Sequence, residues 1–142
     1  VAAYRANAAA TVADLRRLDR AYRAGLANCA NRHLVTGHAA FGYLAHRYHL
    51  TQVAIAGISP DTEPSAGQLA AVTRAVERHH VRTVYTETLV SPAVAEAIAD
   101  EAGVATAVLD PIEGITDDSA GDDYLAVMRS NLATLRAGQP CA

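Results

Sequence analysis

Residues 33–38, HLVTGH, open a regular alternation of short apolar segments and helical segments that decides the fold. Similar apolar runs recur further along the chain, and the segments between them carry apolar residues at the three-to-four spacing of amphipathic helices. Parallel strands need connections of about a dozen residues, usually helices, and such crossovers are right-handed. The sequence therefore predicts an α/β fold, a four-stranded parallel sheet with helices on both faces, preceded by a long helix.

The expected strands are Leu34–Thr36, Val53–Ala56, Thr83–Thr86 and Thr106–Leu109. The expected helices are residues 4–27, Ala39–Tyr48, Gln68–His79, Pro92–Ala102 and a last helix through Arg136 that Asp122 or Asp123 caps. Ser65 and Ser91 are well placed as helix N-caps, Pro92 suits a first helical position, and Gly103 is a helix stop. Residues 59–65 are expected to form a loop with two prolines.

Composition limits the classes of function. The formal net charge of -3 and a pI near 6.0 argue against a nucleic-acid-binding surface. No apolar run is long enough to span a bilayer. The 142 residues suffice for one compact domain with its own core. Since the chain starts at Val1, we expect a processed product or a fragment.

The two cysteines leave two states open. Cys29 follows the first helix and Cys141 lies at the C-terminus, in a spacing that matches no zinc motif. Free thiols are the usual state in the cytosol. A bridge would tie the C-terminal tail to the start of the first strand and would require an oxidising compartment.

Polar side chains gather where the expected strands end. His38 follows the first strand, Ser59 the second, Glu87 the third and Asp110 the fourth. Ligands of parallel α/β sheets bind beyond these carboxyl ends, and imidazole with carboxylate suits a divalent cation such as zinc. We therefore single out His38 and Asp110 as metal ligands. Two side chains rarely hold a metal tightly, so the pair is incomplete.

Each of these residues also has a structural alternative. His38 could lie at the N-cap or in the first turn of the following helix, and Asp110 could form an Asx turn before Pro111. Glu87 could cap a turn or accept a hydrogen bond that orients His38.

The other histidines are weaker candidates. Those near helix ends are expected on the surface, and His33 is expected to be structural. The sequence contains no nucleophile elbow, dinucleotide-binding motif or P-loop. The histidines near helix ends, which are expected on the surface, are His46, His49, His79 and His80.

Several motifs together resemble one family. Residues 37–48, GHAAFGYLAHRY, and 57–65, GISPDTEPS, look like consecutive blocks of the zinc- and manganese-binding solute-binding proteins of bacterial ABC transporters. Thr86-Glu87 with Ser91-Pro92, then LDPIEG at 109–114, then residues 122–132 resemble the following blocks, in family order.

The resemblance implies two α/β lobes joined by one long helix, with the metal between the lobes. The chain matches the helix, residues 1–28, and the C-terminal metal-binding lobe, residues 29–142. In the family this lobe supplies a histidine matching His38 and, in many members, an aspartate matching Asp110. The remaining ligands come from the N-terminal lobe, which the sequence lacks. A disulfide is frequent in this lobe, which favours a Cys29–Cys141 bond.

The first functional reading is therefore the C-terminal lobe of an extracytoplasmic protein, periplasmic or a cell-surface lipoprotein. It binds zinc, with manganese possible, performs no reaction, and delivers the metal to the membrane permease of an ABC importer. The alternatives are a small flavodoxin-like enzyme domain and an adhesin-like interaction domain. Without its companion lobe the first helix exposes apolar residues, so we also expect self-association through residues 4–15.

Overall fold

The computed structural model describes residues 1–59, 63–88 and 90–142 and confirms the predicted fold class. Its strands are β1 (His33–Thr36), β2 (Thr51–Ala54), β3 (Thr83–Thr86) and β4 (Ala105–Val108). Its helices are α1 (Ala2–Gly25), α2 (Gly42–Arg47), α3 (Ala66–Arg78), α4 (Ala93–Ala102) and α5 (Tyr124–Gly138). All strand pairs are parallel, in the order β2-β1-β3-β4. The middle of the expected 59–65 loop, residues 60–62, lies outside the described residues.

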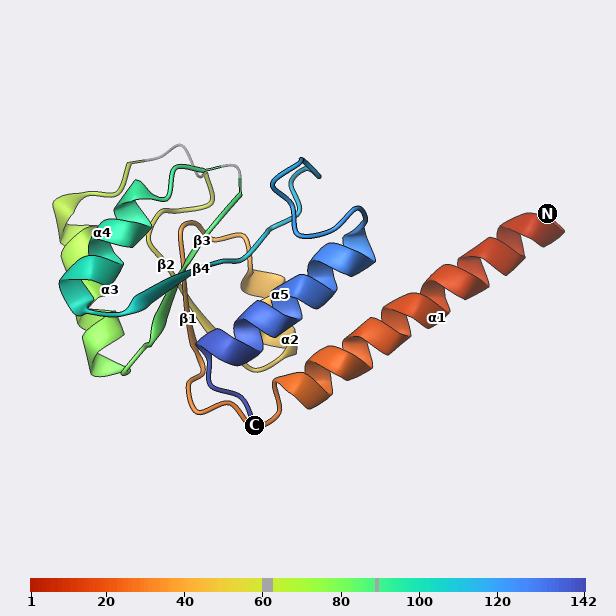
Figure 1. The fold of residues 1–142 in the computed structure, drawn as a ribbon, viewed down its shortest axis with the longest axis horizontal. Coiled ribbons are helices and arrows are strands. Elements are labelled where there is room, and N and C mark those ends of the chain that lie inside the picture. The colour runs from red at the N-terminus through yellow and green to blue at the C-terminus, as the bar shows by residue number, and fades with distance from the viewer. Residues whose placement is uncertain (60–62, 89) are drawn as a thin grey trace.

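Helices cover both faces of the sheet (Figure 1). On one face Val35 and Val84 pack with Val76 and Ile98 from α3 and α4. On the other face the core contains residues of β1, β3, α1, α2 and α5, among them Leu34, Tyr85, Tyr22, Ala45 and Leu135. Neighbouring residues of a strand point to opposite faces, so each buried strand supplies both cores.

Two boundaries differ from expectation for reasons that concern the site. Strand β2 starts at Thr51, two residues early, because Thr51 pairs with His33 in register. Helix α2 starts at Gly42 rather than Ala39, because the Ala39 N–H donates to the carbonyl of Gly57, 3.0 Å away. The segment after His38 is thereby held as a loop against the segment after β2.

The caps largely match the sequence. Ser65 and Gln68 form a capping box at the start of α3, and Asp123 accepts from the Ala126 N–H at the start of α5. Gly103 ends α4 in the left-handed conformation. Pro92 is the N-cap of α4 rather than its first helical residue, because the helix begins at Ala93.

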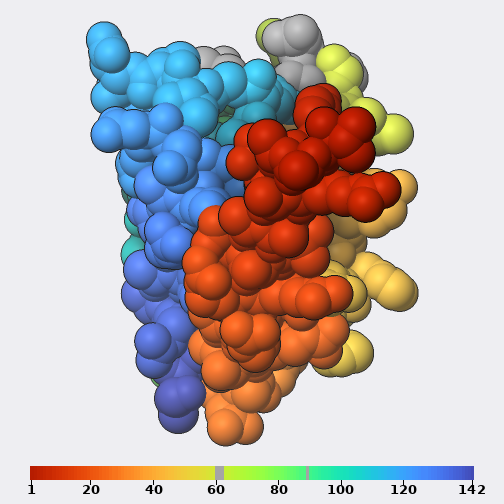
Figure 2. All heavy atoms as spheres, turned by 90° about the vertical axis from the view of Figure 1, so that its right-hand side faces the viewer, coloured from red at the N-terminus to blue at the C-terminus, as the bar shows by residue number. Residues whose placement is uncertain are grey.

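Helix α1 is attached at one end only. Its C-terminal part is anchored by the Tyr22 hydroxyl, which donates to the carbonyl of Met128, and by Asp19, which accepts from Arg47 and Tyr48. The Arg47 guanidinium holds the pKa of Asp19 well below its usual range. The N-terminal part extends away from the body, and every residue from 1 to 13 is exposed (Figures 1 and 2). In the described part of the chain no helix has the length and apolar character needed to cross a bilayer.

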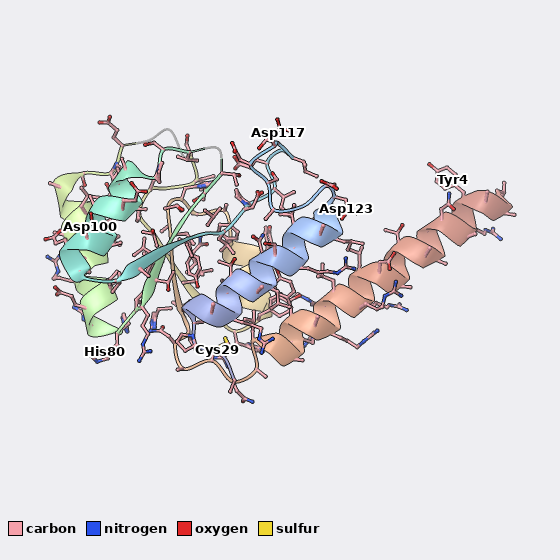
Figure 3. The ribbon with its side chains drawn as sticks, viewed as in Figure 1. Tyr4, Cys29, His80, Asp100, Asp117 and Asp123 are labelled. Atoms are coloured by element: carbon pink, nitrogen blue, oxygen red, sulfur yellow. A yellow bond between two sulfur atoms is a disulfide. The ribbon has the colours of Figure 1, made fainter. Side chains whose placement is uncertain are left out.

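The Cys29–Cys141 disulfide is present, as the family resemblance predicted, at the base of α1 (Figure 3). The two Cα atoms are 3.8 Å apart, closer than the roughly 4.4–6.8 Å usual for disulfides. The cysteines form an isolated antiparallel bridge flanked by hydrogen bonds from Ala30 to Pro140 and from Ala142 to Asn28. In such a non-hydrogen-bonded pair the backbones approach most closely.

His33 stacks on His79 at the edge of the sheet where the strands begin, with ring centroids 3.7 Å apart. Loss of hydration lowers the pKa of His33, and the nearby His79 lowers it further. The folded protein therefore binds a proton at His33 less readily than the unfolded chain does.

This difference predicts a loss of stability in mild acid. The His33 contribution is complete above its unfolded-state pKa, about 6.5, and is lost as the pH falls through the window below that value. We expect the free energy of unfolding of the wild type to fall more steeply between pH 7.5 and 5.5 than that of His33→Phe, whose ring can stack but not ionise. Denaturant unfolding at several pH values measures this, and parallel profiles would contradict it.

Candidate metal centre

The strand order places a binding edge between β1 and β3. From β1 the chain crosses to β2 on one side, and from β3 it crosses to β4 on the other. In open α/β sheets ligands bind at such a switch point, outside the carboxyl ends of the strands. His38 follows β1 and Glu87 follows β3, so both stand at this point.

Glu87 contacts His38 twice. Its Oε1 accepts the backbone N–H of His38 at 2.9 Å, and its Oε2 lies 2.5 Å from Nδ1 of the imidazole. Oε2 and Nδ1 are as close as the atoms of an ion pair, but their geometry is not that of a hydrogen bond. Both residues are buried. Burial raises the pKa of Glu87, and the N–H groups of His38 act in the opposite direction. This is the arrangement expected of a carboxylate that orients an imidazole.

The other imidazole nitrogen faces a residue that the sequence analysis did not select. Nε2 of His38 lies 3.3 Å from Oε1 of Glu113, whose side chain is 44% exposed. Two donors about 2.0–2.2 Å from a tetrahedral zinc ion stand about 3.4 Å apart. The separation of Nε2 and Oε1 therefore fits two ligands of one zinc ion.

Asp110 shapes the loop that carries Glu113. Its Oδ1 accepts the Ile112 N–H at 2.7 Å, which is the Asx turn that the sequence analysis weighed as an alternative. The Asn131 amide bonds to both backbone groups of Asp110, at 3.0 and 2.7 Å. Ile112 has a φ of 62°, a strained value for a β-branched residue. His38 and Asp110 share the same edge of the sheet, but the side chain of this loop that contacts His38 is that of Glu113.

Buried polar atoms without hydrogen-bond partners concentrate at this edge. Among the described residues six such side-chain atoms occur, and four belong to residues that follow β1, β3 and β4. They are His38 Nδ1, Glu87 Oε2, Thr88 Oγ1 and Asp110 Oδ2. His38 Nδ1 and Glu87 Oε2 lie against each other, so Thr88 Oγ1 and Asp110 Oδ2 are the two atoms of this set that a bound ion or water would satisfy.

The donor set of this chain is incomplete. In the ranges that the structure describes, no three side chains of His, Cys, Asp or Glu converge as one metal-binding group. Structural zinc sites have four ligands. The geometry therefore fits a half-site that needs donors from elsewhere.

His33, His49, His79 and His80 lie near the starts of the strands, away from this edge, and His46 is exposed on α2. His49 and His80 follow α2 and α3 with left-handed φ values of 59° and 51°. Figure 3 shows His80 at the end of the molecule opposite to Asp117, which belongs to the loop after β4. His79 is engaged with His33, as described above.

An α/β lobe with a histidine–carboxylate half-site and a projecting helix is the expected form of one part of a metal-binding solute receptor. The chain belongs to the ZnuA family, zinc-uptake complex component A, periplasmic, whose model matches residues 1–138. Zinc-binding protein AdcA of Streptococcus pyogenes is 45% identical over 135 residues, which is 94% of this chain and 26% of AdcA.

Solved structures agree with this assignment. The laminin-binding protein Lbp of S. pyogenes superposes with a TM-score of 0.89 at 35% identity, over 96% of this chain and 53% of Lbp. The Zn(II)-bound ZnuA-like domain of Streptococcus pneumoniae AdcA gives a TM-score of 0.75 at 44% identity, over 96% of this chain and 52% of that chain. The chain thus spans between a quarter and about half of these relatives.

Gly37 gives a direct test of the Glu87–His38 contact. A Cβ at position 37 would lie 2.8 Å from Glu87 Oε1, so Gly37→Ala must displace the carboxylate from the His38 N–H. We expect a loss of about 1–3 kcal/mol in the free energy of unfolding and a large change in the His38 amide proton shift.

Gly57→Ala is the matched control, because a Cβ there meets nothing within 4 Å. It should leave both the stability and the His38 amide signal near their wild-type values. A Gly37→Ala variant that behaves like Gly57→Ala would contradict the close approach.

Proposed function

We propose that this chain is the C-terminal lobe and connecting helix of an extracytoplasmic zinc-binding protein that delivers zinc to the permease of an ABC importer. The observation that carries the proposal is the 3.3 Å separation of His38 Nε2 and Glu113 Oε1, the spacing of two zinc ligands. Membership of the ZnuA family supports it. In this assignment zinc is the transported cargo.

The proposal divides the chain into two parts. We assign residues 1–28 to the connecting helix, of which residues 1–13 are exposed, and residues 29–142 to the lobe. The chain covers 53% of Lbp, so a second lobe of comparable size would fit beside α1 in the whole protein. That lobe supplies the ligands that complete the shell.

The carboxylates near His38 have different proposed roles. His38 binds the metal through Nε2, while Glu87 holds Nδ1 and keeps the ring oriented. Glu113 supplies an oxygen donor from the loop after β4. Asp110 is the second candidate for a carboxylate ligand, because its Oδ2 has no hydrogen-bond partner. Its Oδ1 holds the loop of Glu113 in place by accepting from the Ile112 N–H.

Zinc is favoured over manganese by the donor types. Imidazole with carboxylate suits zinc, whereas manganese sites draw on more oxygen ligands. The Zn(II)-bound state of the AdcA domain agrees with this choice. Manganese remains the second cargo, and its uptake would require further oxygen donors from the companion lobe.

The family assignment favours transport over the other two readings. The family is one of zinc-uptake components, so the flavodoxin-like enzyme reading loses its support. The name of Lbp refers to laminin binding, but relatives named for zinc also match 94% and 96% of this chain. Localisation outside the cytoplasm follows the family description and agrees with the disulfide.

Zinc titration of the chain tests the proposed ligands. The wild type should bind zinc weakly, because two protein ligands leave half of a four-coordinate shell to water. His38→Ala and Glu113→Ala should each weaken binding by about tenfold or more, a loss at least as large as outer-shell changes cause. Asp110→Asn keeps an Asx-turn acceptor, so it should weaken binding only if Oδ2 is a ligand. Calorimetry measures all four proteins.

The His79→Ala, His80→Ala double variant is the control for adventitious zinc. It should bind zinc as the wild type does. The ligand assignment fails if His38→Ala and Glu113→Ala leave the affinity unchanged, or if the control alone abolishes binding.

We also propose that the chain on its own self-associates through α1. The side chains of Tyr4, Val12 and Leu15 are 84%, 44% and 42% exposed on its projecting part. A second copy would cover these residues, as the companion lobe would in the whole protein.

Sedimentation at increasing concentration should show dimers for the wild type. Val12→Asp with Leu15→Asp should shift the equilibrium to monomer, because a charge would be buried in the contact. Ala6→Asp with Ala13→Asp adds the same charge on the opposite, exposed face of α1 and should retain the dimer. A wild type that stays monomeric at high concentration contradicts the proposal.

A further inference from the structure

A second set of side chains holds His38 from the side opposite Glu87. The Thr36 hydroxyl donates to the carbonyl of His38 at 2.7 Å. The Gln52 amide donates to the Thr36 hydroxyl at 2.8 Å and to the same His38 carbonyl at 3.1 Å. We call Thr36 and Gln52 the carbonyl clamp.

The orientation of the Gln52 amide follows from its partners. A carbonyl oxygen only accepts hydrogen bonds, so the NH₂ group of Gln52 must face His38. The opposite orientation would bring two acceptor oxygens together. The Thr36 hydroxyl uses its proton for the same carbonyl and receives one from Gln52, so each donor of the clamp is matched to an acceptor.

The clamp arises from the register of β1 and β2. Gln52 pairs with Leu34, two residues before Thr36, so Gln52 and Thr36 lie on the same face of the sheet. The long Gln52 side chain runs along this face towards the end of β1, where Thr36 is fully buried. Backbone hydrogen bonds join the two segments beyond Thr36, from the Ala56 N–H to the Gly37 carbonyl and from the Ala39 N–H to the Gly57 carbonyl. The clamp adds side-chain hydrogen bonds to the carbonyl of His38, which lies between these two positions.

Together with Glu87 the clamp leaves His38 little freedom. Glu87 holds the His38 N–H, while Thr36 and Gln52 hold its carbonyl. With both backbone groups fixed, only the two side-chain torsions remain. Glu87 Oε2 beside Nδ1 restricts these, and Nε2 is directed at Glu113.

We infer that Thr36 and Gln52 are positioning residues for metal capture, which fix the backbone of His38 so that Nε2 meets the ion without reorganisation. The inference rests on the proposed function of His38. A ligand held in place before the metal arrives loses less conformational freedom on binding. Partners of metal ligands typically contribute 10- to 100-fold in affinity, although they never touch the metal.

Substitutions at Thr36 separate the hydroxyl from the packing. Thr36→Val keeps the shape of the side chain and removes the hydroxyl. The His38 carbonyl still accepts a hydrogen bond from Gln52 in this variant, so no buried carbonyl is left without a hydrogen-bond donor. Thr36→Ser keeps the hydroxyl and removes a methyl group. Gln52→Leu removes the whole amide.

The experiment uses the 142-residue chain and zinc chloride as the probe. Thr36→Val and Gln52→Leu should each weaken zinc binding about tenfold or more, and Thr36→Ser should stay within about twofold of the wild type. In the metal-free protein at constant pH, the ring ¹⁵N resonances of His38 should shift or broaden in Thr36→Val and remain in place in Thr36→Ser. A general packing defect would give the reverse order, because Val resembles Thr in shape more than Ser does.

Three outcomes overturn the inference. If Thr36→Val binds zinc as the wild type does while His38→Ala does not, the role of the clamp fails and the proposed function stands. If Thr36→Ser loses as much affinity as Thr36→Val, the effect belongs to packing. If His38→Ala itself binds zinc normally, the proposed function of His38 fails, and the role of the clamp in metal capture fails with it.

Discussion

The contact between Glu87 and His38 is the interaction on which the site depends. It joins the residues that follow β1 and β3, the two central strands of the sheet. The chain leaves these two strands towards opposite sides of the sheet, so the contact lies at the switch point. A buried carboxylate is unfavourable unless it is hydrogen-bonded, and the backbone N–H of His38 meets this need. The sheet thereby holds one imidazole with Nδ1 beside the Glu87 carboxylate and Nε2 facing Glu113. Gly37 permits the approach, because any side chain there would collide with the Glu87 carboxylate.

The rest of the fold supports that edge from two sides. The parallel sheet brings all strand ends to one edge, and the helices on both faces bury the strands so that those ends are fixed in position. The disulfide and the Asp19 contacts anchor the base of α1 on the same lobe. In the proposed function, a second lobe would contact the exposed half of α1 and complete the donor set.

The sequence predicted the fold because its signals are local. Apolar runs, amphipathic spacing and capping residues such as Ser65 and Gly103 define strands and helices without long-range information. The same logic predicted that His38, Glu87 and Asp110 share one edge, since residues at the ends of parallel strands lie together, and their roles in metal binding stay a prediction. The late start of the expected 39–48 helix, at Gly42, was missed because the Ala39 N–H donates to Gly57, a contact between distant segments. The disulfide could be favoured only through the family resemblance.

Glu113 shows where such reasoning stops. It stands three residues after Asp110, in a loop whose course depends on an Asx turn, on a left-handed Ile112 and on Asn131 in α5. Spacing from the strand end cannot predict where such a loop directs a side chain. The sequence feature that could have indicated Glu113 is its residue type, because it is a second carboxylate in the segment that follows β4.

Anomalous X-ray diffraction at the zinc edge, from crystals of the chain grown with zinc, tests the central claim most directly. The account predicts one peak about 2.0–2.1 Å from His38 Nε2, with a Glu113 oxygen in the same shell and Glu87 still on Nδ1. A zinc ion bound to Nδ1, or a peak only at His79 and His80, would contradict it.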